Sequence, residues 1–567
     1  MPYTAPATDL SFILDHIAGL PAVAATERFA DATPDMSTAI LTEAAKMCDE
    51  VLAPLQRNGD TDPARLENGV VRTSKGFGDG YRAIAEGGWI GMSGPVEYGG
   101  MGLPLALTTA VNDMMAGACL SLQLNPLMAQ GQIEALEHHA SDAIKELYLP
   151  KLISGEWCGT MNLTEPQAGS DVGALTSKAE PNGDGTYAIT GQKIYISWAD
   201  NDFTDNVCHL VLARLPDGVP GTKGISLFLV PKFLPDEDGN AGKRNDLRVV
   251  SLEHKMGLHG SPTAVMEYAG ATGWMVGPEN GGMAAMFTMM NNARVGVGTQ
   301  GVGAGEGAYQ HALAYALERK QGKAGGSGSI IEHADVRRML AEMKSELFAA
   351  RSITMMCACA LDMTTATGDA AWRARAALLT PIAKAFGSET GIKVASMGVQ
   401  VHGGMGVIEE TGAAQYVRDV RVTAIYEGTN GIQAMDLVGR KMMDGGEAAQ
   451  ALLEEIQAGA DSAKADHPEL AEAVWQAAAD LSECVDHIAT LETPDRFAGA
   501  VPFLMAFARV LGGHAHLKAA LEGDAARQRL ATFYITRLLP DVGGLIAQVR
   551  TDSAELMSLT ADDLAVA

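Results

Sequence analysis

The spacing of hydrophobic residues changes twice along the chain, and this change constrains the fold more than any other feature of the sequence. From residue 35 to Leu152, apolar residues recur at helical spacing. From Trp157 to about Val276 they form short, β-branched runs bounded by Gly, Asp, Asn or Pro, and after Gly277 the helical spacing returns. The sequence therefore predicts an α+β protein in which a β domain separates two helical regions.

Five segments are expected from this pattern. Residues 1–34 form an N-terminal extension, and residues 35–156 form a helical domain. Residues 157–280 form the central β domain, of barrel-like or sandwich-like form. A C-terminal helical domain, expected to be a four-helix bundle, covers 281–445, and an additional helical domain covers 446–567. The long helices of the bundle are expected at 283–319, 334–364, 371–401 and 412–445.

Three finer expectations concern local structure. Asp35 is expected to be the N-cap of the first long helix. Thr-Gly-Gln-Lys at 190–193 is expected to form a tight hairpin. Glycines between Gly296 and Gly307 form G-x-G patterns, but no strand precedes them, so they fail the test for a dinucleotide-binding loop. Close helix packing is expected instead.

Charge excludes some classes of partner. The 567 residues carry a formal net charge of -27, and the last segment holds 19 acidic and 8 basic residues. Nucleic-acid and anionic-membrane binding depend largely on Lys and Arg, so neither partner is expected. The N-terminus lacks the basic start and apolar core of a signal peptide, and no stretch of about 18 uninterrupted apolar residues follows. A cytoplasmic protein is expected.

The cysteines predict neither disulfides nor a metal site. There are seven, an odd number, with no C-x-x-C pair. Cys357 and Cys359 are close in sequence, but residues two apart on a helix point to different faces. Buried, reduced thiols are therefore expected.

One carboxylate stands among an aromatic residue, a glycine and short polar side chains, in Ile-Tyr-Glu-Gly-Thr-Asn-Gly-Ile-Gln at 425–433. Apolar residues precede Glu427, so its side chain is expected to enter a partly dry site, where burial raises a carboxylate's pKa toward that of a general base. The alternative is a glutamate that stabilises the N-terminus of the following helix.

A second polar motif, Leu-Thr-Glu-Pro-Gln-Ala-Gly-Ser-Asp, occupies 163–171 at the entry to the β domain. Thr164 and Ser170 place hydroxyls beside backbone loosened by glycine, which suits hydrogen bonds to a flat ring edge or a phosphate. The alternative is an ordinary polar turn.

Two further stretches carry groups suited to a cofactor. Tyr195 and Ser197 lie two residues apart on a predicted strand and share one face, although core packing is the alternative. Gln-Val-His-Gly-Gly-Met-Gly at 400–406 supplies an amide and a glycine-rich bend that could receive a pyrophosphate or ribose. His402 within it is more readily explained as a structural histidine.

In order and spacing, these motifs and the segment order resemble the acyl-CoA dehydrogenase superfamily of flavoproteins, over about residues 35–445. The resemblance implies FAD as cofactor, an acyl-CoA substrate and Glu427 as the base. It implies cofactor-binding roles for Met161, Leu163, Thr164, Gly169, Ser170, Tyr195, Ser197, Arg319, Gln400, Gly403, Gly404, Thr429 and Gln433. Substrate contacts are implied for Ser170, Arg294, Tyr426 and Gly428.

The sequence departs from the family pattern at several of these positions. Tyr195 replaces the usual Trp, Ser197 stands where the family often has Thr, and Ala334 stands where a cofactor-binding glutamine is expected. The family's acidic residue three positions before Arg294 is Asn291 here. For Arg294 itself, a surface helix arginine is the alternative.

The activity implied by the resemblance is α,β-dehydrogenation, in which Glu427 removes the α-proton and the β-hydride passes to the flavin. The N-terminal extension and the last helical domain resemble the long bacterial form, which implies 3-methylmercaptopropionyl-CoA, from dimethylsulfoniopropionate breakdown, as substrate. The alternatives are a straight-chain acyl-CoA of β-oxidation and an alkylation-response DNA-associated flavoprotein. An electron-transfer flavoprotein as electron acceptor and a homodimer, or else a tetramer, are also implied.

Overall fold

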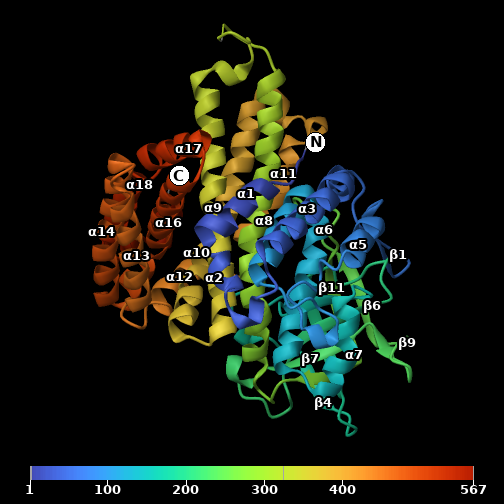
Figure 1. Cartoon of the computed structure of the whole chain (residues 1–567). Helices are drawn as coiled ribbons and strands as arrows, with labels where there is room; N and C mark the ends of the chain where they lie inside the picture. Colours follow the sequence, from blue (N-terminus) through green and yellow to red (C-terminus); the bar gives the residue numbers. More distant parts are fainter. Residues whose placement is uncertain (1–2, 324, 566–567) are drawn as a thin grey trace. The chain divides into compact units, whose positions relative to one another are not determined.

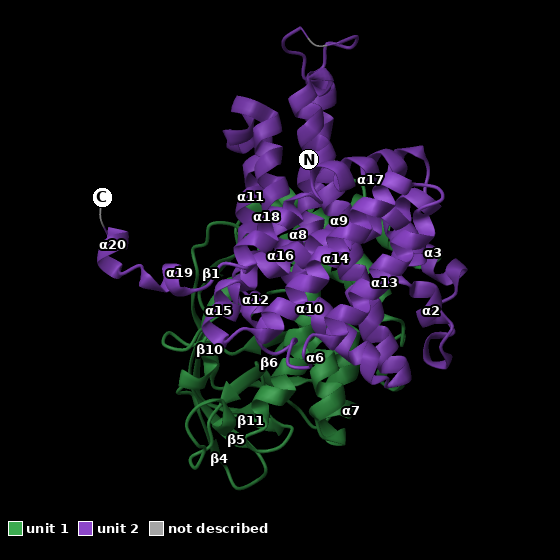
Figure 2. Ribbon diagram, turned by 90° about the vertical axis from the view of Figure 1, so that its left-hand side faces the viewer, with its two compact units in different colours: residues 1, 3–5, 39–296 green, residues 2, 6–38, 297–567 purple. Residues whose placement is uncertain are grey.

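The computed structural model describes residues 3–323 and 325–565, which divide into two compact units (Figure 2). Unit 1 comprises residues 3–5 and 39–296, and unit 2 comprises residues 6–38 and 297–565. One boundary lies between residues 5 and 6, and the other two fall within the helices α3 (Pro34–Met47) and α8 (Gly282–Glu318). The predicted α+β fold, with helical, β and helical regions in that order, is confirmed.

Unit 1 begins with helices, most of which the apolar spacing predicted. They are α4 (Leu55–Thr61), α5 (Phe77–Glu86), α6 (Leu105–His139) and α7 (Asp142–Ile153), with a small hairpin, β1 (Arg65–Glu67) and β2 (Val70–Arg72), after α4. The expected N-cap of α3 is wrong: the Met36 N–H donates to Thr33 Oγ1, at 3.2 Å. Pro34 then occupies the first helical position, where its missing N–H costs nothing.

A seven-stranded sheet forms the second part of unit 1. Its strand order is β3-β6-β7-β11-β5-β4, with β10 also paired to β11. The β3–β6 pair is parallel, and the other pairs are antiparallel. The strands are β3 (Trp157–Asn162), β4 (Lys178–Pro181), β5 (Tyr187–Ser197), β6 (Asn206–Ala213), β7 (Ser226–Pro231), β10 (Leu247–Leu252) and β11 (Thr263–Val276), beside a separate hairpin of β8 (Phe233–Pro235) and β9 (Ala241–Arg244).

The hairpin expected at residues 190–193 is wrong, because β5 runs through it as one strand paired with β11. Gly191 has a φ of +153°, and a Cβ there would lie 2.3 Å from Ser177 Oγ. The glycine is therefore explained by the close approach of a neighbouring segment within the sheet, and not by a chain reversal.

The bundle of unit 2 contains three long helices, α8, α9 (Ala334–Thr367) and α10 (Ala370–His402), close to the expected ranges (Figure 1). The fourth expected helix, 412–445, is wrong as a single helix. It consists of α11 (Ala413–Val420), a 3₁₀ turn at Arg421–Ala424 and α12 (Asn430–Gly439), and Glu427 lies in the break before α12.

The expected role of the glycines in α8 is confirmed within unit 2. A Cβ on Gly298 would lie 2.5 Å from Ala383 O, and a Cβ on Gly301 would lie 2.4 Å from Gly387 O. On the facing helix, a Cβ on Gly391 would lie 2.2 Å from Gly301 O. Backbone therefore packs directly on backbone where α8 meets α10, which side chains at these positions would prevent.

Residues 6–34 of the N-terminal extension and the described part of the last segment also belong to unit 2. The N-terminal extension forms α1 (Ala7–Phe12), a π-helical turn and α2 (Leu20–Ala24). The last segment forms α13 (Glu447–Ala463), α14 (Pro468–Thr490), α15 (Thr493–Ala498), α16 (Ala500–Glu522), α17 (Ala525–Arg537), α18 (Asp541–Val549), α19 (Ala554–Ser558) and α20 (Ala561–Ala565).

One buried ion pair and two half-buried ones join these terminal segments to the bundle and to each other. Arg509 on α16 donates to both carboxylate oxygens of Glu346 on α9, at 2.6 and 2.8 Å. Asp9 on α1 pairs with Lys344 at 2.7 Å and with Arg527 at 2.8 Å. Burial raises the pKa of Asp9, but the charges of Lys344, Arg351 and Arg527 outweigh it and lower that pKa to about 2. The Asp9 carboxylate is therefore ionised, and it holds the N-terminal extension to both α9 and α17.

Three helical stretches of the described chain are long and apolar enough, by length and composition, to cross a membrane. In Leu105–His139 and Ala334–Thr367, 94% and 78% of the apolar window is buried inside the protein, and in Ala525–Val549 39% is buried. All seven cysteines are free and buried, as expected.

Candidate active site

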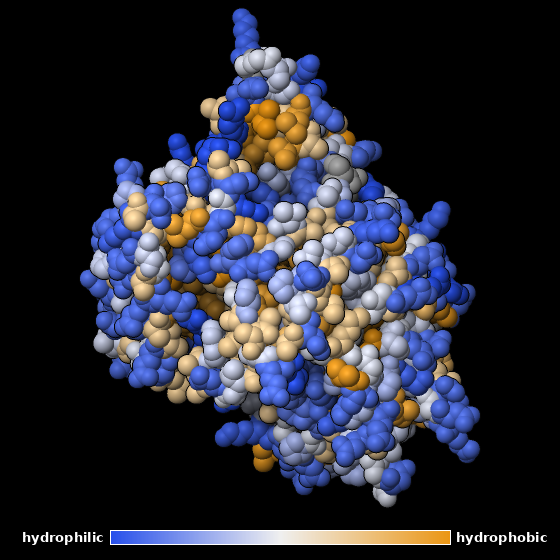
Figure 3. All heavy atoms as spheres, viewed as in Figure 1, coloured by the Kyte–Doolittle hydropathy of each residue, from blue (hydrophilic) through white to orange (hydrophobic). Residues whose placement is uncertain are grey.

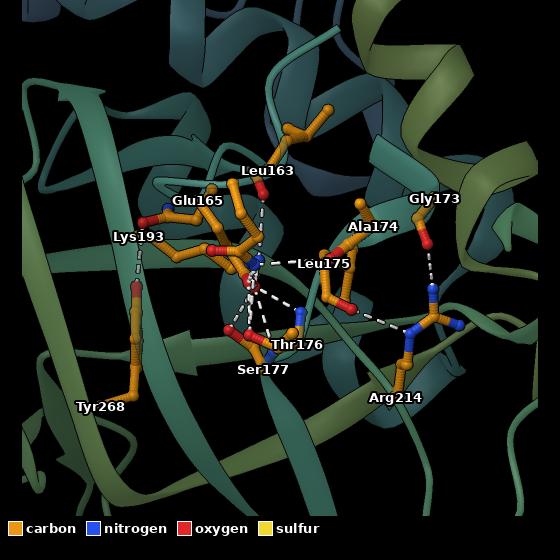
Figure 4. Close-up of polar contacts among 12 residues, drawn as sticks. Leu163, Glu165, Gly173, Ala174, Leu175, Thr176, Ser177, Lys193, Arg214 and Tyr268 are labelled. Carbon is orange, nitrogen blue, oxygen red and sulfur yellow. Dashed lines mark hydrogen bonds and ion pairs between the residues drawn. The ribbon is translucent and has the colours of Figure 1, made fainter. Parts of the chain in front are cut away.

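The loop after β3 is fixed by one buried glutamate (Figure 4). Glu165 accepts hydrogen bonds from the N–H and hydroxyl groups of Thr176 and Ser177, at 2.5–3.1 Å. It also pairs with Lys193 of β5, at 2.8 Å, and both side chains are at most 2% exposed. The loop is therefore tied at its start to β5 and to the segment that precedes β4.

The pKa values of Glu165 and Lys193 depend on burial and on the attraction between the two charges. Burial lowers the pKa of Lys193 to about 8, against the attraction of Glu165. Burial raises the pKa of Glu165, but the charge and hydrogen bonds of Lys193, with those of Ser177 and Thr176, outweigh it and lower that pKa to about 2. At neutral pH the pair is ionised, with both charges satisfied by hydrogen bonds.

The ion pair of Glu165 and Lys193 is called the clamp below. The loop residues that the resemblance assigned to the cofactor lie around it. Leu163 O accepts from Lys193 Nζ at 3.0 Å, and Thr164 O accepts from Ile194 N at 2.9 Å. Met161, Leu163 and Thr164 are half-buried, and Gly169 and Ser170 are exposed. A Cβ on Gly169 would meet nothing within 4 Å, so its backbone is open to a ligand.

Tyr195 has a strained backbone. Its φ is +61°, in the left-handed region that a bulky residue rarely adopts, and it lies where the β5–β11 register shifts, as in a β-bulge. Its side chain is 62% exposed, and the half-buried Ser197 follows two residues later. Core packing of Tyr195 is therefore wrong: the strain holds an aromatic ring at the surface of unit 1.

Trp198, unlike Tyr195, packs inside the protein. It is fully buried and donates its indole N–H to Ser121 O, at 3.1 Å. Tyr195 and Trp198, three residues apart, therefore differ in burial: the first ring is exposed and the second is fully buried.

Arg294 lies on α8, in the part of the helix that belongs to unit 1. Its side chain is 5% exposed, with the guanidinium 6.0 Å from the ring centroid of Phe287. A surface arginine, the alternative for this position, is wrong. Arg294 is a buried cation.

Glu427 lies in unit 2, two residues before the N-cap of α12. That N-cap is Thr429, whose Oγ1 accepts from Ile432 N at 3.3 Å. Glu427 is half-buried and has a φ of +57°, and Gly428 follows with a φ of +85°. Because a non-glycine residue rarely adopts such a backbone, the conformation is imposed by surrounding contacts.

Two buried glutamines provide such contacts on either side of Glu427. Tyr426 donates its hydroxyl to Gln300 on α8, and burial raises the pKa of Tyr426 well above its ordinary value. Gln433 on α12 donates its Nε2 to Glu427 O, at 3.1 Å, and to Gly428 O, at 3.5 Å. Gln433 is fully buried, so it holds the segment from inside.

A lysine and an asparagine fix the start of α12. Lys384 on α10 is fully buried and donates to Asn430 Oδ1, at 2.9 Å. Asn430 in turn donates to Ser388 Oγ at 3.0 Å and to Glu389 at 2.7 Å. The segment that carries Glu427 is therefore anchored to α8, α10 and α12 of unit 2.

The glycine-rich bend lies at the end of α10. Gln400, Gly403 and Gly404 are exposed, and a Cβ on either glycine would meet nothing within 4 Å. His402 is buried, with its Nδ1 hydrogen-bonded to Gly398 O at 2.7 Å and its ring stacked on Tyr315. Its interpretation as a structural histidine agrees with these contacts.

Arg319 is exposed just after α8, and its carbonyl accepts from Ile330 N at 2.8 Å. Ala334, where the family glutamine was expected, is the first residue of α9.

The assigned residues divide between the two units. Unit 1 holds those of the β3 loop, β5 and Arg294, and unit 2 holds Arg319, the glycine-rich bend and residues 426–433. The motifs themselves did not assign roles to Glu165, Lys193, Gln300 or Lys384. Glu165 and Lys193 stood inside quoted motifs, so their opposite charges within one domain were the available signal.

Four family profiles match this chain in sequence order. Those described as acyl-CoA dehydrogenase N-terminal, middle and C-terminal domains match residues 34–156, 160–270 and 280–443. One described as acetyl-CoA dehydrogenase C-terminal like matches residues 452–560. The fold and its motifs thus define an oxidoreductase class, and the chain belongs to the acyl-CoA dehydrogenase family.

The chain is also similar to particular proteins of known name. The chain is 46% identical to 3-methylmercaptopropionyl-CoA dehydrogenase of Ruegeria pomeroyi, over 89% of this chain and 88% of the relative. It is 38% identical to a butyryl-CoA dehydrogenase of Syntrophomonas wolfei, over 70% and 68%. The crystal structure of Caenorhabditis elegans ACDH-11 in complex with C11-CoA has the same fold, with a TM-score of 0.80 and 20% identity over 94% of this chain and 91% of that one.

Proposed function

We propose that this acyl-CoA dehydrogenase oxidises 3-methylmercaptopropionyl-CoA to the trans-2-enoyl thioester, with Glu427 as the general base. The relative that is 46% identical over 89% of the chain supports this substrate. The left-handed, clamped backbone at Glu427 supports its role, because strained residues held by their surroundings gather at active sites.

The residues of the chain fit FAD as cofactor. The backbone is open beside Gly169, Gly403 and Gly404, where a side chain would otherwise stand. Thr164 and Ser170 add hydroxyls, and Tyr195 adds an exposed aromatic ring. These donors suit a ring edge, a ribose and a pyrophosphate. When bound, FAD supplies the acceptor for the hydride that leaves the β-carbon.

The chain itself supplies the acid–base part of the reaction. The Glu427 carboxylate takes the proton from the α-carbon, as the C–H bond breaks and negative charge moves to the thioester oxygen. The Glu427 N–H is proposed to donate to that oxygen, and a preorganised donor of this kind contributes about 2.7–4 kcal/mol in comparable sites. Tyr426 and Gly428 would border the acyl group, and Arg294 would lie near the substrate entrance.

We also propose a cytoplasmic homodimer that passes electrons to an electron-transfer flavoprotein. The visible face of the molecule is mostly hydrophilic, with a few hydrophobic patches (Figure 3). Met405, within the glycine-rich bend, and Val407 and Ile408, just after it, are 44–70% exposed. Such a run of apolar side chains supports a protein interface beside the proposed cofactor contacts.

A straight-chain acyl-CoA is the second candidate substrate, because the chain is 38% identical to a butyryl-CoA dehydrogenase. A DNA-associated flavoprotein has less support, because the net charge of -27 disfavours binding to a phosphate backbone.

Anaerobic bleaching of the flavin at about 450 nm distinguishes the candidate substrates. The holoenzyme is mixed with butyryl-, octanoyl-, palmitoyl- or 3-methylmercaptopropionyl-CoA, and the rate of bleaching is compared. We expect the fastest bleaching with the thioether substrate and the slowest with palmitoyl-CoA. The reverse order would refute the small-substrate proposal, and retention on DNA at physiological salt would favour the nucleic-acid alternative.

A further inference from the structure

We propose that Gln433 is a positioning residue for the base: its buried amide holds the backbone at Glu427 and so sets the directions of the carboxylate and of the Glu427 N–H. This inference rests on the proposed role of Glu427. It also changes the expectation for Gln433, from a contact with the cofactor to a contact with the catalytic segment.

Gln433 makes two hydrogen bonds to the backbone of the segment that carries Glu427. Its Nε2 donates to two successive carbonyl groups, Glu427 O at 3.1 Å and Gly428 O at 3.5 Å. These two carbonyls belong to the two peptide units that follow the Cα of Glu427. An amide that binds both restricts rotation of the backbone where the Glu427 side chain branches.

The backbone dihedrals show why such a restraint is needed. Glu427 has a φ of +57°, a conformation that costs energy for any residue with a Cβ. Without an external contact the segment would relax toward ordinary dihedral angles, and the carboxylate would move with it. The next residue, with a φ of +85°, is a glycine, for which this conformation carries no such cost.

The close packing of Gln433 against Gly428 is the second independent observation. A Cβ on Gly428 would lie 2.8 Å from Gln433 Nε2. Glycine at this position is therefore needed both for its dihedral angles and for the approach of the amide.

The remaining amide oxygen of Gln433 argues against a purely stabilising role. Gln433 is 0% exposed, and its Oε1 has no hydrogen-bond partner among the described residues. A buried acceptor without a partner lowers stability, and an apolar side chain of similar shape would avoid that loss. The presence of an amide is instead explained by the two carbonyl groups, Glu427 O and Gly428 O, that its N–H groups hold.

The test compares Gln433→Met with Gln450→Met in the full-length holoenzyme. Gln450 likewise donates its Nε2 to a main-chain carbonyl, Ser482 O at 3.0 Å, but it lies in α13, outside the catalytic segment. For each variant, kcat per bound FAD, KM, FAD content and the pH profile of kcat are measured. Gln433→Asn, which keeps an amide but is one methylene shorter, is the second variant in case Gln433→Met does not fold.

We expect kcat per bound FAD of both Gln433 variants to fall by roughly 10- to 100-fold, because a misplacement of about 1 Å has that effect on catalysis. KM and FAD content should match those of Gln450→Met. An unchanged kcat per bound FAD would overturn the proposal, and loss of FAD with normal kcat in the loaded fraction would overturn it in favour of a cofactor contact. Glu427→Gln, run in parallel, tests the base separately: its normal turnover would refute the proposed function itself.

Discussion

At the scale of single residues, the buried pair of Glu165 and Lys193 is what fixes the β3 loop. Six hydrogen bonds converge on one carboxylate from Gln167, Thr176, Ser177 and Lys193 (Figure 4). Positioning of this kind allows the neighbouring Thr164 and Ser170 to meet a ligand without first ordering the loop.

Replacing Glu165 by Gln should lower the free energy of unfolding by about 3–5 kcal/mol, because it leaves the buried Lys193 without its counter-charge. Since the folded pKa of Glu165 is lowered to about 2, its contribution is complete above its ordinary value of 4.5 and is lost as the pH falls toward 2. Urea unfolding followed by fluorescence from pH 7 to pH 3 measures this difference.

The control is Glu267→Gln, which breaks an exposed ion pair with Arg248 and should cost less than about 1 kcal/mol at any pH. If Glu165→Gln were no more destabilised than this control at pH 7, the clamp would not hold the loop.

At this scale the sequence could identify candidate residues by their chemistry, but not the contacts that they make. The motifs led to Glu427 and to the short hydroxyls of the β3 loop, because those residue types suit a base and a ring edge. They could not reveal the strain at Tyr195, where the register of β5 and β11 shifts, nor the hydrogen bonds of Gln433, which depend on how α12 follows the segment that carries Glu427.

At the scale of elements, α8 and α10 pack through glycines rather than through side chains. Gly298, Gly301, Gly387 and Gly391 bring the two backbones together in unit 2. Helices that approach this closely leave little room for adjustment, since the obstructing atoms belong to the main chain.

Gly301→Ala should therefore lower the thermal midpoint of unfolding, with a cost of about 1–3 kcal/mol from overpacking. The new Cβ would lie 2.4 Å from Gly387 O. Gly543→Ala on α18 is the matched control, because its Cβ meets nothing within 4 Å and should stabilise the helix by up to about 1 kcal/mol. Equal shifts in the two midpoints would contradict the proposed packing.

Element type was easier to predict than element ends. The three long bundle helices agree with their apolar spacing to within a few residues. The single helix expected at 412–445 did not include the break between α11 and α12, because apolar residues continue at helical spacing on both sides and Gly428 and Gly431 alone mark it. Only the alternative for Glu427 placed a helix N-terminus there. At Gly191 a turn was expected but none occurs. This glycine lies inside β5 and allows the close approach of Ser177.

At the scale of the whole molecule, helical, β and helical regions follow one another as in the acyl-CoA dehydrogenase family, and a further helical domain follows them. The change in hydrophobic spacing predicted this order because each period belongs to one type of element. Pairs such as Glu346 with Arg509 could not be predicted, since 163 residues separate them and each was one charged residue among many.

Glu427 is proposed to remove the α-proton of an acyl-CoA. The most direct measurement is the anaerobic rate of flavin bleaching at about 450 nm in Glu427→Gln and in the wild-type holoenzyme, with the best substrate of the panel in excess. We expect the variant to keep its FAD and bind the substrate, while the rate falls by roughly 100- to 10,000-fold, the usual contribution of a general base. Bleaching of FAD-loaded Glu427→Gln at the wild-type rate would contradict this role of Glu427.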